Sequence, residues 1–92
     1  MPTVTLFSTS TPVTLRAKSS IRRLEFLLNV LKVEYTLVDL AQEPHKLLAM
    51  LRGSNGDTTL PQLHINGCLV GDIESINERH DFGELVPMLK GQ

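Results

Sequence analysis

Thiol chemistry in this chain depends on Cys68, because the sequence contains a single cysteine. One cysteine excludes an internal disulfide and a dithiol redox pair. Cys68 follows an Asn66-Gly67 turn signal late in the chain, and a lone cysteine is most often a small packing residue. We therefore predict that Cys68 packs against its neighbours. The alternative is an exposed thiol that forms a mixed disulfide or retains monothiol activity.

The three histidines show no metal-binding pattern. His45, His64 and His80 are separated by 19 and 16 residues. Zinc ligands are usually spaced by only about two to five residues within each pair. The sequence also lacks a glycine-rich phosphate loop, a nucleophile elbow and a pair of catalytic carboxylates. We therefore predict no metal site and no enzyme motif of these kinds.

Basic side chains gather in the first third of the chain. Residues 1–33 carry five basic side chains and one acidic one, whereas residues 34–92 carry four basic and nine acidic ones. The candidate patch consists of Arg16, Lys18, Arg22 and Arg23. Positive charge at the start of a helix opposes the helix dipole, so helix stability does not explain the cluster. A solvated surface is the simpler interpretation, and a partner that carries acids or phosphates is the alternative.

The composition is that of a folded soluble protein, with 41% hydrophobic and 21% charged residues. Its 92 residues suit one domain, residues 1–92. The net charge of −1 argues against nucleic-acid binding, and no apolar stretch reaches the roughly 18 residues that span a membrane. With one cysteine and no secretory signal pattern, we expect a monomer in the cytoplasm, with the nucleus as an additional location.

The first half of the chain alternates between strand and helix patterns. Short apolar runs predict strands at Val4–Phe7 and Tyr35–Leu40. Between them, a leucine-rich face at helical spacing predicts an amphipathic helix from about Lys18 to Lys32. The residues of that face are Ile21, Leu24, Leu27, Leu28 and Leu31.

A second helix is predicted from Pro44 to Gly53, since proline suits a first helical turn and glycine a helix end. Its core-facing residues are expected to be Leu47, Leu48 and Leu51.

The second half contains the strongest hairpin signal. Pro61–Ile65 and Cys68–Val70 are short apolar runs joined by Asn66-Gly67. A helix is predicted from Ile73 to His80, followed by a short extra helix around Leu85.

The order is therefore β-α-β-α-β-β-α. Strands separated by helices predict parallel pairing, whereas the hairpin is antiparallel. We predict an α/β fold with a mixed four-stranded sheet and helices on both faces.

This order, with a proline opening the third strand, resembles the thioredoxin fold in its glutaredoxin-like form. The segment Thr59-Leu60-Pro61-Gln62-Leu63-His64-Ile65-Asn66-Gly67 resembles the glutaredoxin threonine–hydrophobe–proline–glutamine stretch. Gly71-Asp72 resembles the glycine–acid step that follows the hairpin. The resemblance implies a thioredoxin-like fold and a cis bond between Leu60 and Pro61.

Within that group, the segments Phe7–Ser10, Lys18-Ser19 and Tyr35–Leu40 resemble the SH3-domain-binding glutamic-acid-rich-like proteins. Those proteins keep the fold and lose the redox cysteines. Their proline-rich SH3 ligand corresponds here to Thr58–Pro61, and one proline is too few for a polyproline ligand. SH3 binding is therefore not expected.

The resemblance places the catalytic thiol of glutaredoxins before the first helix, where N–H groups lower its pKa. Residues 9–16 occupy this place and contain no cysteine. Serine and threonine hydroxyls do not ionise near neutral pH without an activating base. We therefore predict that the protein is redox-inactive and not an enzyme.

The resemblance also implies a shelf for an extended peptide or glutathione. Leu60 beside Pro61 would pair with the peptide backbone, and Gly71 and Asp72 would receive a γ-glutamyl end. A simpler interpretation is that Pro61 shapes a turn, Gly71 permits a bend and Asp72 caps a helix. Thr9 is also a candidate for this shelf, but it stands where glutaredoxins usually carry a glutathione-binding lysine, which weighs against glutathione.

The hypothesis that these observations favour is a non-catalytic adaptor or modulator of protein–protein interactions, with an unidentified protein partner and no cofactor. The alternatives are a glutathione or γ-glutamyl peptide binder and a degenerate glutaredoxin that acts through Cys68.

Overall fold

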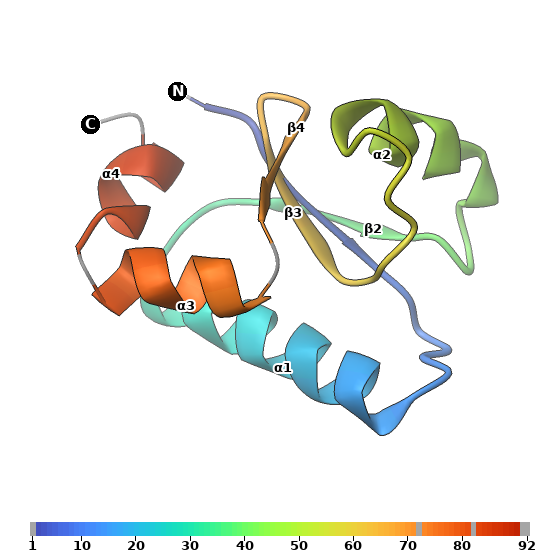
Figure 1. Ribbon diagram of the computed structural model, residues 1–92, viewed down its shortest axis with the longest axis horizontal. Helices are drawn as coiled ribbons and strands as arrows, with labels where there is room; N and C mark the ends of the chain where they lie inside the picture. The colour runs from blue at the N-terminus through green and yellow to red at the C-terminus, as the bar shows by residue number, and fades with distance from the viewer. Residues whose placement is uncertain (1, 72, 82, 91–92) are drawn as a thin grey trace.

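The computed structural model describes residues 2–71, 73–81 and 83–90, and its centre is a four-stranded sheet (Figure 1). The strand order across the sheet is β2-β1-β3-β4. The pairing of β1 with β2 is parallel, whereas β3 is antiparallel to both β1 and β4. The strands are β1 (Val4–Ser8), β2 (Thr36–Asp39), β3 (Gln62–Ile65) and β4 (Cys68–Gly71).

The mixed sheet and the antiparallel hairpin confirm two predictions, but parallel pairing holds only for β1 and β2. Phe7, in β1, is paired with Val38 of β2 and with Gln62 of β3. The C-terminal end of β2 and the N-terminal end of β3 therefore lie at the same end of the strands. Because α2 and the loop of residues 54–61 return the chain to that end, β3 runs antiparallel to β1 and β2.

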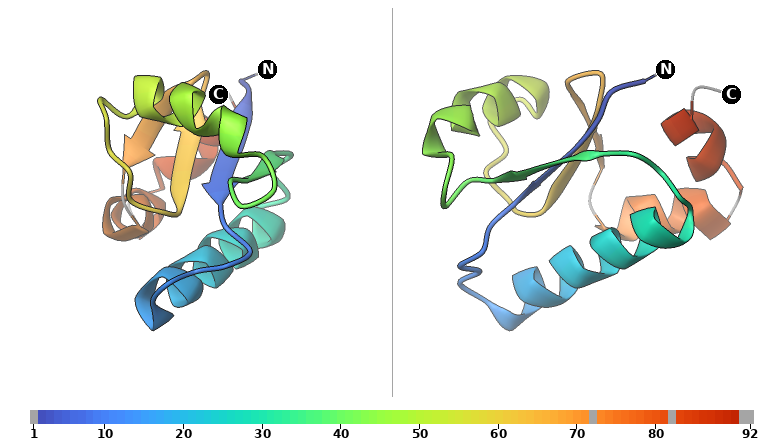
Figure 2. Two further views of the ribbon diagram at one scale, coloured as in Figure 1. Left: turned by 90° about the vertical axis from the view of Figure 1, so that its right-hand side faces the viewer. Right: turned by 180° about the vertical axis from the view of Figure 1, so that it is seen from behind.

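Four α-helices in the described part of the chain surround the sheet. Figure 2 shows α1 and α2 on opposite sides of it. The helices are α1 (Leu15–Val30), α2 (Leu47–Gly53), α3 (Ile73–Asp81) and α4 (Leu85–Lys90), and a 3₁₀ turn at Pro44–Lys46 precedes α2. α1 begins three residues before the predicted start because Thr14 caps it: the Thr14 hydroxyl accepts a hydrogen bond from the Ala17 N–H at 3.0 Å.

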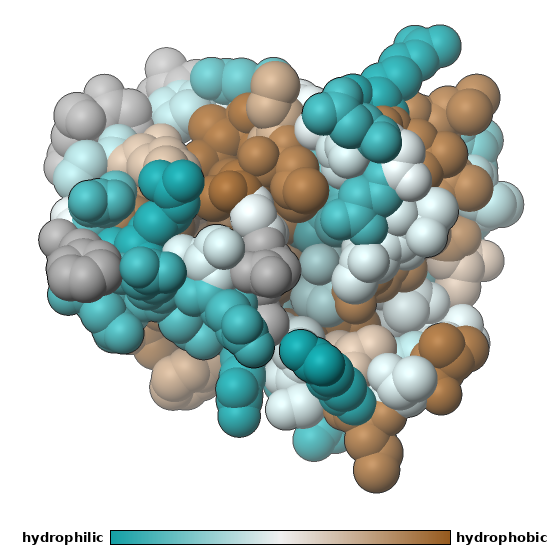
Figure 3. All heavy atoms as spheres, in the orientation of Figure 1, coloured by the Kyte–Doolittle hydropathy of each residue, from teal (hydrophilic) through white to brown (hydrophobic). Residues whose placement is uncertain are grey.

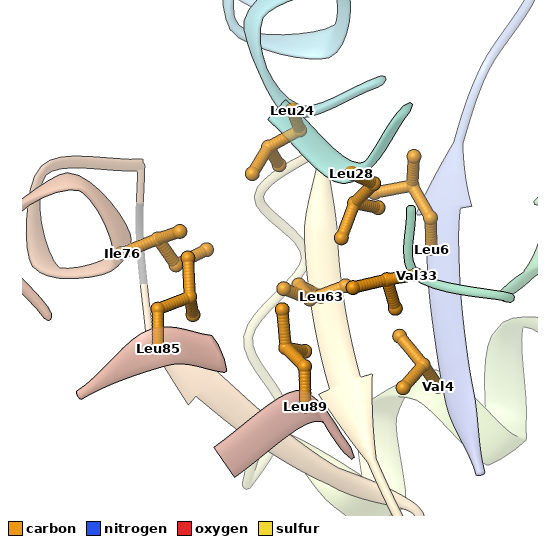
Figure 4. Packing of buried hydrophobic residues seen from close by; sticks show 9 residues of the cluster. All are labelled: Val4, Leu6, Leu24, Leu28, Val33, Leu63, Ile76, Leu85 and Leu89. Atoms are coloured by element: carbon orange, nitrogen blue, oxygen red, sulfur yellow. The ribbon is translucent and has the colours of Figure 1, made fainter. Parts of the chain in front are cut away.

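The larger core lies between the sheet and α1, α3 and α4. Leu24 and Leu28 of α1 meet Leu63 of β3, while Leu85 and Leu89 approach the same strand from α4 (Figure 4). The alternation of β1 places Val4 and Leu6 on this face of the sheet. The predicted leucine-rich face of α1 is thus confirmed as its core face.

The smaller core lies on the other face, between the sheet and α2, and is built from Phe7, Val38 and Met50. The predicted core face of α2 is wrong in part. Leu48 is 64% exposed and Leu47 is 39% exposed, whereas Met50 is fully buried. Residues two apart on a helix point about 200° apart, so burying Met50 turns Leu48 toward solvent.

None of the helices within the described ranges has the length and apolar character needed to cross a membrane.

Candidate functional site

A groove of about 440 Å³ lies where the start of α1, the loop before β3, the strand β4 and the start of α3 come together. Its lining combines apolar side chains with two acids and one base. The lining residues are Thr14, Arg16, Ala17, Ser20, Asp57, Thr59, Leu60, Pro61, Gln62, Leu69, Gly71 and Glu74.

One wall of the groove is the segment before β3. The peptide bond between Leu60 and Pro61 is cis, as the resemblance implied. Upstream, an Asp57 carboxylate oxygen accepts a hydrogen bond from the Thr59 N–H at 2.8 Å. This bond holds the pKa of Asp57 below its ordinary value, so the groove carries a negative charge on this wall at neutral pH.

A buried chain of hydrogen bonds supports this wall from behind. The side-chain amide of Gln62 donates to the Asp57 carbonyl at 2.7 Å, and its oxygen lies 2.8 Å from Nε2 of His64. Gln62 and His64 are 2% and 1% exposed. The Ser54 hydroxyl, at the end of α2, lies 2.8 Å from the Met50 carbonyl and 3.1 Å from the Asp57 carbonyl, and its one proton is shared between these two acceptors. The wall is therefore tied to both α2 and β3.

His64 occupies an apolar environment on the α2 side of the sheet. Its ring contacts Phe7 edge-on, with ring centroids 4.7 Å apart. Burial lowers the pKa of His64 below 6.5, and a hydrogen bond with the Gly67 backbone opposes this shift. His64 is thus held neutral in the folded protein at neutral pH.

The stability of the protein is expected to fall between pH 7.5 and pH 5.5 because of His64. The unfolded chain binds a proton at the ordinary pKa of 6.5, whereas the folded chain binds it only at lower pH. The contribution of His64 to the free energy of unfolding is therefore complete above pH 6.5. It is lost as the pH falls from 6.5 toward the lower pKa that His64 has in the folded chain. Urea unfolding at both pH values measures it.

His64→Gln should flatten this pH dependence, since glutamine does not titrate, and His45→Gln is the matched control because His45 is exposed. An unchanged slope in His64→Gln would contradict this assignment.

The opposite wall of the groove is the first turn of α1. The Thr14 hydroxyl is engaged as the helix cap, and the side chains of Ala17 and Ser20 follow on the same side. The Arg16 guanidinium lies 3.8 Å from the Glu74 carboxylate of α3, and both side chains are at least 80% exposed. Such an exposed pair contributes little stability and leaves both charges available to a ligand.

The predicted basic patch is spread around more than one side of α1. Arg16 and Arg23 are seven residues apart and share one side of α1, whereas Lys18 and Arg22 are four apart and share another. Of the four, Arg16 is the residue that lines the groove. The helical twist, which turns successive residues about 100°, separates charges that are adjacent in the sequence.

Leu60, Pro61 and Gly71, three of the predicted shelf residues, line the groove together. Gly71 has a φ of 153°, and a Cβ atom there would lie 2.9 Å from the Cβ of Ser75. Glycine is therefore required where β4 leads into α3, which supports the simpler interpretation of this residue. Asp72 lies outside the described residues.

Thr9 does not join the groove in the part of the chain that the structure describes. Its hydroxyl accepts a hydrogen bond from the Thr11 N–H at 3.1 Å, which directs it to its own loop. The loop is also held by Asp39, whose carboxylate accepts from the Ser10 N–H at 3.0 Å. The prediction of Thr9 as a shelf residue is therefore not supported by the geometry.

The expected packing role of Cys68 is wrong, because Cys68 is exposed. It begins β4, which is an edge strand, so one flank of the strand faces solvent. Within the described ranges, Cys68 is not among the groove residues.

Reasoning from the sequence missed four groove residues: Asp57, Glu74, Ala17 and Ser20. For Ala17 and Ser20 the available signal was Thr14 as a helix cap, because it would have moved the predicted start of α1 toward the N-terminus. Asp57 and Glu74 lack such a signal, since they reach the groove only through the packing of the loop and of α3. Within the described residues, no group of three histidine, cysteine or acidic side chains could hold a metal ion.

This sheet order, with helices on both faces and a cis-proline before β3, defines the thioredoxin fold. Comparison with solved structures agrees. A buckwheat glutaredoxin–glutathione complex superimposes with a TM-score of 0.75 and 27% identity, covering 98% of this chain and 78% of that one. The C. albicans actin interacting protein Aip5 shares the fold with a TM-score of 0.76 and 18% identity, covering 99% and 91%.

The curated relatives are similar to the chain in sequence as well. Glutaredoxin-3 of Mus musculus is 38% identical over 66 residues, which are 72% of this chain and 19% of that protein. Glutaredoxin-3 of Homo sapiens is 35% identical over 66 residues, again 72% and 19%. The chain spans about a fifth of the length of these relatives. No family model matches it. The chain therefore has the thioredoxin fold in its glutaredoxin-like form.

Proposed function

We propose that this glutaredoxin-like chain is a non-catalytic adaptor that binds an extended peptide segment in the groove beside Pro61. The observation that carries the proposal is a groove beside Pro61 whose α1 wall contains Thr14 and no cysteine. The sole cysteine, Cys68, is in β4 and outside the groove lining of the described chain.

The groove suits a peptide with polar groups and at least one apolar side chain. Leu60, Pro61 and Leu69 supply apolar contact surface. The carboxylates of Asp57 and Glu74 would accept hydrogen bonds from N–H or basic groups of the peptide. The Arg16 guanidinium would donate to a carboxylate or a carbonyl oxygen of the peptide. Mixed charge of this kind favours a zwitterionic or mixed-sequence segment over a uniformly acidic one.

The second candidate is binding of glutathione or a γ-glutamyl peptide. It is supported by the superposition on a glutaredoxin solved as a glutathione complex and by the location of Leu60, Pro61 and Gly71 in the groove. Thr9 turns back onto its own loop and gives this candidate no support.

We further propose that the chain belongs with the SH3-domain-binding glutamic-acid-rich-like branch, whose members lack the redox cysteines, and that it acts in the cytoplasm.

A thiol-exchange assay tests the absence of catalysis. The wild-type chain is expected to give no turnover in the reduction of a glutathione mixed disulfide. Thr14→Cys in a Cys68→Ser background should instead react with oxidised glutathione, because the new thiolate would accept the Ala17 N–H that Thr14 accepts now. A helix-terminal thiolate has a depressed pKa, so we expect alkylation at pH 7 about five- to tenfold faster than for an ordinary cysteine.

Ser19→Cys in the same background is the matched control, since Ser19 is exposed farther along α1. Wild-type turnover that Cys68→Ser abolishes would refute the non-catalytic proposal and establish monothiol activity.

Groove binding is tested by two alanine-to-arginine substitutions. Ala17→Arg fills the groove, whereas Ala49→Arg places the same side chain on an exposed position of α2. Proteins captured through the groove of the wild type should be lost with Ala17→Arg and kept with Ala49→Arg. An NMR titration with millimolar reduced glutathione separates the two candidates. Shifts confined to residues 59–72 favour glutathione binding, and silence removes that candidate.

A further inference from the structure

The outer face of α1 is a second surface, separate from the groove, that the proposed function leaves unexplained. Three large apolar side chains of this helix are turned to solvent: Leu15 is 84% exposed, Phe26 is 70% exposed and Val30 is 58% exposed. Apolar side chains project over the start of α1 at the lower right of Figure 3. The core face of the helix, by contrast, is buried to 8% or less at Ile21, Leu24 and Leu28.

These exposed apolar residues form one stripe. Phe26 and Val30 are four residues apart, and Leu15 precedes Phe26 by eleven, so all three fall on the same side of the helix. Ser19, four residues after Leu15, and Arg22, three residues after Ser19, complete the stripe. Intervals of three and four residues form the ridges that pack against another helix.

The stripe is basic as well as apolar. Arg22 lies within it, and Lys18 and Arg23 flank it. All three are exposed, and none forms an ion pair in the described part of the chain. Exposed phenylalanine beside arginine is the composition that protein interfaces favour.

We propose that the outer face of α1 docks an acidic amphipathic helix of a partner protein. Leucine-type side chains of that helix would pack on Phe26 and Val30, and its carboxylates would face Arg22 and Arg23. Together with the groove, this surface would allow the adaptor to hold two partners at once. The inference does not rest on the groove, because no groove residue belongs to the stripe.

Two other occupants fit less well. A second copy docked α1 to α1 would bring Arg22 and Arg23 against their own counterparts, and like charges repel. An anionic membrane would need a continuous apolar stripe to enter the acyl region, but Arg22 interrupts the stripe between Leu15 and Phe26.

The test uses a designed 21-residue peptide of three heptads, with leucine at positions a and d and glutamate at e and g. We expect it to bind the wild-type chain and to shift amide NMR signals along α1 rather than those of residues 57–62. Raising the salt concentration should weaken binding, because the charges are exposed. A peptide with the same composition but without the heptad order should not bind.

Matched variants locate the contact. Arg22→Glu with Arg23→Glu should weaken binding about tenfold or more, and Phe26→Ala about fivefold. Arg52→Glu and Leu48→Ala are the controls, because these residues are exposed on α2 and should have no effect. Circular dichroism confirms that each variant folds.

Three results would overturn the inference: no binding of the ordered peptide, equal binding by the wild type and the stripe variants at Arg22, Arg23 and Phe26, or binding of phosphatidylserine vesicles through Phe26 in place of the peptide. Loss of peptide binding with Ala17→Arg but not with these stripe variants would assign the peptide to the groove instead.

Discussion

Gly53→Ala is expected to lower the free energy of unfolding by about 2 kcal/mol or more, because α2 crosses the β3–β4 hairpin without room for a side chain. A Cβ atom on Gly53 would fall within van der Waals overlap of the Gly67 carbonyl oxygen and 2.8 Å from the ring of His64. The first of these is a backbone atom, so the overlap is relieved only if α2 moves away from the sheet. Alanine restores at most about 1 kcal/mol of helix propensity.

Urea unfolding followed by circular dichroism measures this loss. Gly56→Ala is the matched control: a Cβ there meets nothing within 4 Å, but φ is 86°. The free energy of unfolding of the control should therefore fall by only about 1–2 kcal/mol, the cost of a non-glycine residue in the left-handed region. The pair separates a loss caused by missing space from one caused by backbone conformation. A Gly53→Ala protein as stable as the wild type would contradict the close contact.

Gln62→Leu is expected to destabilise the protein by about 2 kcal/mol and to loosen the groove wall. The substitution removes the hydrogen bonds at 2.7 Å to the Asp57 carbonyl and at 2.8 Å to His64. Nε2 of His64 then loses its hydrogen-bond partner in an environment where a buried unsatisfied polar atom costs about 1–3 kcal/mol. The Asp57 carbonyl still has the Ser54 hydroxyl at 3.1 Å, which it shares with the Met50 carbonyl, so the substitution costs less at Asp57 than at His64.

The free energy of unfolding and the amide signals of residues 57–61 report the two effects together. Gln42→Leu is the control, because Gln42 is exposed. If Gln62→Leu changed neither quantity, the buried chain of hydrogen bonds would not be what holds the wall in place.

Reasoning from the sequence succeeded where the signal is local. The hairpin at Asn66-Gly67 is predicted because asparagine and glycine tolerate positive φ. Both residues do have positive φ in the structure. The core face of α1 was predicted because its leucines recur at helical spacing, and Leu24 and Leu28 are indeed buried. Pro61, immediately before β3, allowed the cis bond between Leu60 and Pro61 to be predicted from the family resemblance.

It failed where a side chain's role depends on its neighbours in space. The leucines of α2 look equivalent in the sequence, but contact with the sheet buries Met50 and exposes Leu48. Gly53 was interpreted as a helix end, whereas its lack of a Cβ is what lets α2 approach Gly67 and His64. The basic cluster looked continuous in the sequence, but the helical twist placed Arg16 beside the groove and Lys18, Arg22 and Arg23 in or beside the outer stripe.

The candidate site divides in the same way. The sequence determined by itself that residues 9–16 hold no thiol and that a proline and a glycine stand at the places expected for a shelf, because these are statements about residue type and order. Only the tertiary structure joined Arg16, Asp57 and Glu74 into one groove with Pro61 and exposed Cys68 on an edge strand. The reason is physical. Periodicity and turn chemistry act between residues close in the chain, whereas a groove forms between elements whose contact is set by the packing of the whole core.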